Sequence, residues 1–234
     1  MVMSGKIKIG ALRSELNIEL HTFYAINTWT GRHRTEHKGG IIGMPRFFRL
    51  ISNIHRDSIA DNPYADAAML CLETLIDDAS RQIQYRLDAA DILMAKQIPA
   101  NITLSDPVSS EPLNIGVHSY TPLGYRCVYL LVGFDQLALR LFQLHHYGLI
   151  STQYRDHGLQ EGGSQIRRIF TCAQSYRSIS VSRTDIALNN DSALQAVKLL
   201  GNVDEAILLG EKRSRFSPLV NSDAVLLLKN SQYE

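Results

Sequence analysis

The sequence predicts a mainly α protein with a few short strands, folded as a single domain over residues 1–234. Long stretches place apolar residues at every third or fourth position, as amphipathic helices do, and only short stretches alternate strictly as strands do. Hydrophobic residues make up 45% of the chain and no linker rich in Pro, Ser or Gly divides it, so one large core is expected. Residues 113–176 are predicted to be a strand-helix-helix core, and residues 1–112 a strand plus long-helix extension.

The first expected element is a strand over residues 16–21. Leu16, Ile18 and Leu20 alternate with polar residues, so one face points inward. The outward face carries Glu15 and Glu19, whose carboxylates would repel phosphates. This strand is therefore a poor candidate for lying in a DNA groove.

Two helices are expected next. Residues 44–59 repeat apolar side chains at helical spacing and leave a basic side with Arg46, Arg49 and Arg56. Asn62 followed by Pro63 is a strong helix start, and an apolar period continues from there almost to Pro99. Its solvent side is acidic, with Asp77, Asp78, Asp88 and Asp91.

Residues 113–176 contain the predicted core. Leu113, Ile115 and Val117 alternate with short polar residues, which indicates a strand. Thr121-Pro122 starts a helix that Gly148 ends, and Ser151-Thr152 can cap a second helix, although its glycines weaken its first half. Such a unit can bury its apolar surface by pairing with a copy of itself, and the resulting two-stranded ribbon is narrow enough for the DNA major groove.

The last quarter of the chain is expected to be helical but less regular. Residues 182–185 resemble a capping box, which would open a helix running through Leu200 to Gly201. The basic residues Lys212, Arg213 and Arg215 are interpreted as a solvated tail.

Charge is segregated along the chain although its formal net value is only +1. Residues 1–60 carry 9 basic and 4 acidic side chains, residues 61–111 carry 3 and 9, residues 112–181 carry 6 and 3, and residues 182–234 carry 6 and 7. Two basic segments thus flank an acidic one, which could present a basic face to a polyanion. Within the first segment, Arg32 and Arg34 lie in a polar loop that could grip phosphates as a flexible arm or simply be solvated.

No motif for catalysis, a cofactor or a metal is present. The chain lacks phosphate-binding glycine loops, a nucleophile elbow and a zinc-protease signature, so it is predicted not to be an enzyme. His145 and His146 are neighbours and would point about 100° apart on a helix, which disfavours a shared metal.

Cys71, Cys127 and Cys172 are expected to be reduced, buried thiols. With no signal core and no run of 18 apolar residues, a cytoplasmic protein without membrane contact is predicted.

Several motifs resemble a family of proteins encoded by integrating conjugative elements and large conjugative plasmids. The family includes the ribbon-helix-helix transcriptional regulator AcaB, and the similarity covers most of residues 11–190. It is carried by Ala-Leu-Arg-Ser-Glu-Leu (11–16), Trp-Thr-Gly-Arg (29–32), Gly-Ile-Ile-Gly-Met-Pro-Arg-Phe-Phe (40–48), Asn-Pro-Tyr-Ala-Asp (62–66), Thr-Pro-Leu-Gly-Tyr-Arg (121–126) and Arg-Arg-Ile-Phe (167–170).

The resemblance implies a ribbon-helix-helix-like core embedded in a larger helical domain. It implies a homodimeric, sequence-specific DNA-binding protein that regulates conjugative transfer genes, here expected to be an activator with RNA polymerase as a further partner. The paired 113–119 strands would enter the major groove at a pseudo-palindromic promoter operator, with Asn114 and His118 reading bases. Phosphates would be held by Ser151, Thr152, Arg126, Arg167 and Arg168.

Two alternatives stay open. Family relatives carry arginines on the outward side of this strand, whereas this chain has Asn114, Gly116 and His118. The ribbon could instead be amino-terminal, where Lys6-Ile7-Lys8-Ile9 gives a basic alternation and Arg13 follows. In the other alternative the protein is an accessory component of the conjugation machinery, which contacts proteins and not DNA.

Overall fold

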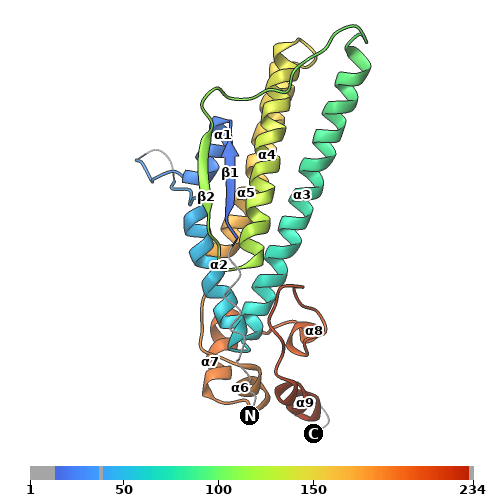
Figure 1. Cartoon of the computed structure of the whole chain (residues 1–234). Coiled ribbons are helices and arrows are strands. Elements are labelled where there is room, and N and C mark those ends of the chain that lie inside the picture. Colours follow the sequence, from blue (N-terminus) through green and yellow to red (C-terminus); the bar gives the residue numbers. More distant parts are fainter. Residues whose placement is uncertain (1–13, 37–38, 232–234) are drawn as a thin grey trace, which may run out of the picture.

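The computed structural model describes residues 14–36 and 39–231. Its helices and strands are, in chain order, β1 (Leu16–Leu20), α1 (Phe23–Thr30), α2 (Met44–Ile59), α3 (Pro63–Gln97), β2 (Leu113–Val117), α4 (Pro122–His146), α5 (Thr152–Ser175), α6 (Arg183–Ala187), α7 (Asp191–Leu200), α8 (Glu205–Leu208) and α9 (Ser222–Ser231). Figure 1 shows long helices side by side, the strands along one flank, and α6–α9 gathered at one end. The mainly helical class with a small sheet is confirmed.

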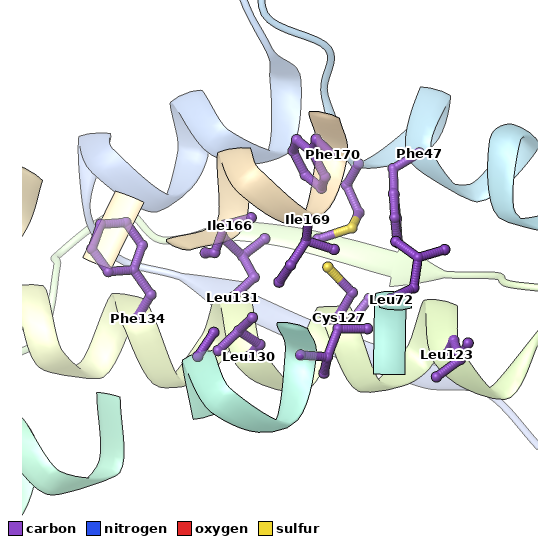
Figure 2. Packing of buried hydrophobic residues seen from close by; sticks show 14 of the residues in the cluster. Phe47, Leu72, Leu123, Cys127, Leu130, Leu131, Phe134, Ile166, Ile169 and Phe170 are labelled. Atoms are coloured by element: carbon purple, nitrogen blue, oxygen red, sulfur yellow. The ribbon is translucent and has the colours of Figure 1, made fainter. Parts of the chain in front are cut away.

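The core lies between α2, α3, α4 and α5, and Figure 2 shows its side chains interlocking. The helices form where expected because their starts are encoded locally. The Asn62 side chain accepts hydrogen bonds from the amides of Tyr64 and Ala65, and Thr121 caps α4 in the same way through Gly124. Phe47, Leu72 and Phe134 are almost completely buried, which ties three helices together.

The glycines of α5 do not weaken this helix, contrary to expectation, because they let α4 approach closely. A Cβ atom on Gly162 would lie 2.5 Å from the Phe134 ring, and one on Gly158 would lie 2.8 Å from Leu141. The helix is continuous from Thr152 to Ser175. Packing against α4 thus compensates for the low helix propensity of glycine.

The partner of β2 differs from the expectation. β2 pairs antiparallel with β1 of the same chain, with Leu16 opposite Val117 and Leu20 opposite Leu113. The reason is physical: both strands carry one apolar face, and pairing them in this register lets Ile18, Leu20 and Val117 join the helical core without a second copy. The two-stranded ribbon of the described residues is therefore made within one chain.

The predicted helix over residues 183–200 is divided in two. The capping box at Ser182 is present as expected. However, Asn189 takes a φ of 47° and Asn190 caps α7, so the chain turns between α6 and α7. Asparagine tolerates this left-handed conformation better than most residues, which explains the break.

Among the described residues, only α4 has the length and composition of a membrane-spanning helix. Buried positions account for 61% of its apolar window, because α4 is the central helix of the core.

Candidate nucleic-acid interface

Five arginines gather near the start of α2 and the carboxyl-terminal half of α5. Arg32 and Arg34 come from the loop between α1 and α2, Arg46 and Arg49 from the first turns of α2, and Arg167 from α5. The first four line one open cavity of about 490 Å³ together with Gln174 of α5. Arg32 lies close enough to Arg167 for their charges to repel. We call this set of five the arginine patch.

Backbone hydrogen bonds hold the base of this loop, for which the sequence left open a flexible arm or a solvated loop. Arg32 and Ile41 exchange two backbone hydrogen bonds of 2.8 Å, which close the loop like a short ladder. Gly31 has a φ of 76°, and a Cβ on Gly43 would lie 2.3 Å from the Trp29 carbonyl oxygen. Glycine is therefore needed at both ends, and Arg32 is presented from an ordered backbone.

No carboxylate of the described residues lies within ion-pair distance of the patch arginines. Among residues 14–36 and 39–231, none of its five arginines forms an ion pair. Partial burial lowers the pKa of Arg167, and the neighbouring charge of Arg32 lowers it further. The amino end of α2 borders the same cavity and has no side-chain cap, so its dipole adds positive potential. The patch is thus built to attract anions.

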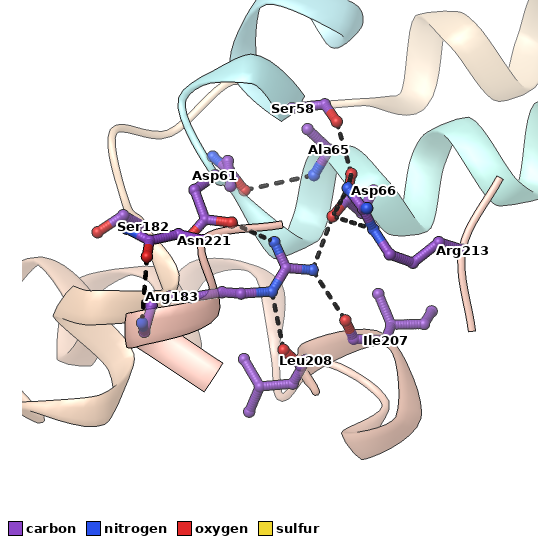
Figure 3. A network of polar contacts seen from close by, with 12 residues as sticks. Ser58, Asp61, Ala65, Asp66, Ser182, Arg183, Ile207, Leu208, Arg213 and Asn221 are labelled. Carbon is purple, nitrogen blue, oxygen red and sulfur yellow. Dashed lines mark hydrogen bonds and ion pairs between the residues drawn. The ribbon is translucent and has the colours of Figure 1, made fainter. Parts of the chain in front are cut away.

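The arginines near the carboxyl end of the chain are arranged in the opposite way. Figure 3 shows Arg183, which is fully buried and donates to Asp61 at 2.8 Å and to Asp66 at 2.7 Å. Arg213 forms a second pair with Asp66, and Arg215 bonds to Glu73 and Asp77 of α3. We call these residues, together with Arg126, the arginine–acid cluster. The interpretation of residues 212–215 as a solvated tail is wrong, because α3 holds Arg213 and Arg215.

The ion pairs of the fold determine which arginines keep an unbalanced charge. Acidic residues of segment 61–111 pair with Arg126, Arg140, Arg183, Arg213 and Arg215, which all follow them in the chain. The ion pairs of the described residues before position 61 join only residues of that same stretch. Of the five described arginines before position 61, only Arg56 forms an ion pair, so Arg32, Arg34, Arg46 and Arg49 keep unbalanced charges.

The residues expected on the ribbon have a different setting. Asn114 lies opposite Glu19 in the β1–β2 register, and its amide donates weakly to the Pro112 carbonyl oxygen at 3.5 Å. His118 packs edge-on against Tyr120, with ring centroids 4.8 Å apart. The outward face of the ribbon therefore carries a carboxylate and lacks a cation among the residues of β1 and β2.

The phosphate-holding residues predicted from the sequence are not all brought together. Arg126 forms an ion pair with Asp77, which neutralises its charge within the fold. Ser151 and Thr152 lie at the opposite end of α5 from Arg167, about 24 Å away by helical rise. Their hydroxyls bind the Tyr154 amide and the His145 ring. Arg168 is exposed on α5, next to the patch in sequence.

Lys6, Lys8 and Arg13 lie outside the described residues. Arg46, Arg49 and Gln174 were not predicted as site residues. The basic side of the helix over residues 44–59 was visible in the sequence, but nothing local indicated that the folded loop would place Arg32 beside it.

No group of three or more His, Cys, Asp or Glu side chains suited to a metal occurs within the described ranges. The prediction that the cysteines are buried is correct for Cys127 and wrong for Cys71, which is exposed, while Cys172 is half-buried.

A family model described as transcriptional regulator AcaB matches residues 8–221, which is nearly the whole chain. The chain belongs to the AcaB family of transcriptional regulators. The resemblance drawn from its motifs is thereby confirmed. Transcriptional regulators are not a class of enzymes, in agreement with the lack of catalytic motifs.

The fold is also similar to that in the crystal structure of selenomethionine-containing AcaB from uropathogenic E. coli. The TM-score is 0.52 at 12% sequence identity, and the match covers 93% of this chain and 97% of that chain. At this identity the likeness to AcaB concerns the fold alone, a helical domain with a small sheet. The comparison with curated proteins found no match.

Proposed function

We propose that this member of the AcaB family regulates transcription by binding double-stranded DNA through the arginine patch. The observation that carries the proposal is the absence of any ion-pair partner for its five arginines within the described residues. Elsewhere in the fold, most arginines are paired with carboxylates. Unpaired arginines on a fixed backbone suit phosphates, since guanidinium can donate two parallel hydrogen bonds to phosphate oxygens.

The size of the patch sets the expected electrostatics. Five arginines that each neutralise one phosphate release counterions, which gives a slope of about −4.5 in log affinity against log salt. Raising salt from about 50 to about 200 mM would then weaken binding on the order of 500-fold per protomer. Phosphate contacts position a protein without reading sequence, so base-reading residues must lie beside the patch.

The regulated genes are proposed to be conjugative transfer genes, with the protein acting as an activator and a homodimer. A two-fold dimer would bring two patches to a pseudo-palindromic operator. The β1–β2 ribbon is a weak candidate for base reading, because Glu19 lies opposite Asn114. An amino-terminal ribbon with Lys6, Lys8 and Arg13 is the alternative candidate for reading bases.

The test is fluorescence anisotropy with labelled transfer-gene promoter DNA and an unrelated duplex, each at about 50 and about 200 mM salt. We expect the promoter to bind more tightly than the control duplex, with strong salt dependence. No binding to any transfer-gene promoter, even at low salt, would contradict the proposal. Comparing Lys6→Ala/Lys8→Ala with Asn114→Ala/His118→Ala then identifies the strand that reads bases.

A second candidate function is an accessory role through protein contacts. It is favoured by large aliphatic side chains exposed on the part of the chain after α5, namely Leu188, Leu194, Leu199, Leu219, Leu226 and Leu227. Exposed apolar surface of this kind can mark a protein interface. Promoter binding that depends on the patch would favour the regulator over this alternative.

A further inference from the structure

Two cysteines from different helices meet at the surface between α3 and α5. The Cys172 thiol donates a hydrogen bond to the Cys71 sulfur, with the two Sγ atoms 3.1 Å apart. They are 101 positions apart in the sequence, so the fold brings them together. Cys71 is exposed and Cys172 is half-buried, whereas Cys127 is fully buried in the core.

We infer that Cys71 and Cys172 form a reversible redox pair, in which a small disulfide such as oxidised glutathione converts the two thiols into an intramolecular disulfide. The two sulfur atoms already touch, so bond formation needs only a small approach of their side chains. The exposure of Cys71 gives a dissolved disulfide access to one of them.

The two thiols have different roles. Cys71 is the attacking group, because the hydrogen bond from Cys172 lowers its pKa to about 6 although burial acts in the opposite direction. Cys172 has a raised pKa because it donates that bond to Cys71 and is partly buried. Cys71 is therefore the thiol that ionises more readily, while Cys172 keeps its proton until the second step.

The reaction balances as thiol–disulfide exchange. The Cys71 thiolate attacks one sulfur of the small disulfide, forms a mixed disulfide and releases one small thiolate. Cys172 then gives up its proton, and its sulfur attacks Cys71 Sγ and expels the second small thiolate. Two protein thiols are oxidised, and the small disulfide is reduced to two thiols by the same two electrons. Both small thiolates leave as thiols, with the proton of Cys172 taken up by one of them and the other protonated from solvent.

The disulfide would join the first half of α3 to the last part of α5, the helix that also carries Arg167. Closing a loop of about 100 residues removes much of the freedom of the unfolded chain. We therefore expect the oxidised protein to melt on the order of 10 °C higher than the reduced one, with the rise reversed by dithiothreitol.

The experiment exposes the full chain, without DNA, to a series of ratios of oxidised to reduced glutathione. Intact mass and non-reducing peptide mapping then locate each sulfur. We expect a Cys71–Cys172 disulfide, with Cys127 reduced as an internal control. In Cys172→Ser, one glutathione should stay bound to Cys71, and Cys71→Ser should react far more slowly.

Free thiols at both positions under the most oxidising ratio would overturn the inference. So would a wild-type protein that keeps glutathione on Cys71 while Cys172 stays free, or that links two molecules through these cysteines. Because every readout is taken without DNA, failure here is distinct from failure of the proposed DNA binding.

Discussion

The arginine patch and the arginine–acid cluster contain the same side chain in opposite electrostatic surroundings. In the cluster, Arg183 is fully buried and its guanidinium donates to two carboxylates and to the carbonyl oxygens of Ile207 and Leu208. In the patch, Arg32 and Arg49 are exposed and face other arginines. The cluster satisfies its charges inside the molecule, whereas the patch leaves them for an external anion.

The difference shows how a protein with a net charge of +1 can still present a strongly basic surface. The acids of α3 and of the turn before it neutralise arginines that follow them in the chain and bind the segment after α5 to the helical core. The described arginines before residue 50 form no ion pair with these acids. Net charge alone would have missed this separation.

Breaking the cluster should have the largest effect. Arg183→Met removes the cation and leaves the fully buried Asp66 with fewer partners, so we expect a loss of about 3–5 kcal/mol in the free energy of unfolding. Urea denaturation measures this loss. Arg168→Met, at an exposed position, is the control and should change stability by less than about 0.5 kcal/mol. A loss below about 1 kcal/mol for Arg183→Met would mean that the buried network contributes little.

Adding one carboxylate to the arginine patch should have the next largest effect. Gln174→Glu places a carboxylate in the cavity lined by Arg32 and Arg49, so an internal partner would compete with phosphate. We expect promoter affinity to fall roughly tenfold at about 0.1 M salt, with stability unchanged. Gln136→Glu, exposed on α4, is the matched control. Equal losses in both variants would indicate a general charge effect and not a specific role of the patch.

Removing one carboxylate from the arginine–acid cluster should have the smallest effect. Burial of Glu73 acts to raise its pKa, but hydrogen bonds from Ser214 and Arg215 outweigh burial, so the pKa is lowered in the folded state. A lowered pKa stabilises the fold above the ordinary value of about 4.3, and this contribution disappears as the pH falls through the folded pKa. Unfolding free energies of Glu73→Gln should therefore depend less on pH than those of the wild type between about pH 5 and pH 3. Identical slopes would exclude the contribution.

Local signals predicted much of the fold. Asn62 and Thr121 are caps that can be read from adjacent residues, and the capping box at Ser182 needs only four positions. The break at Asn189 was missed because the apolar period continues across it. The pairing of β1 with β2 was also missed. The two strands lie about a hundred residues apart, and no local sequence pattern indicates which strand pairs with which or in what register.

The candidate site was predicted only in part, for the same reason. Arg32 and Arg34 were identified from the basic character of their loop, and Arg167 from the family resemblance. Arg126 looked equally available, but its partner Asp77 is 49 positions away and becomes visible only in the fold. Arg46 and Arg49 join the patch because the Arg32–Ile41 bridge folds the loop back toward α2.

The most direct test of the patch is the salt dependence of promoter binding in two double variants. Arg32→Ala/Arg49→Ala removes two patch charges, and Arg81→Ala/Lys198→Ala removes two exposed charges elsewhere. The patch variant should have a slope less steep by about 2 and bind about 60-fold more weakly at about 0.1 M salt, while the control matches the wild type. A patch variant with the slope and affinity of the wild type would contradict the claim that these arginines hold DNA.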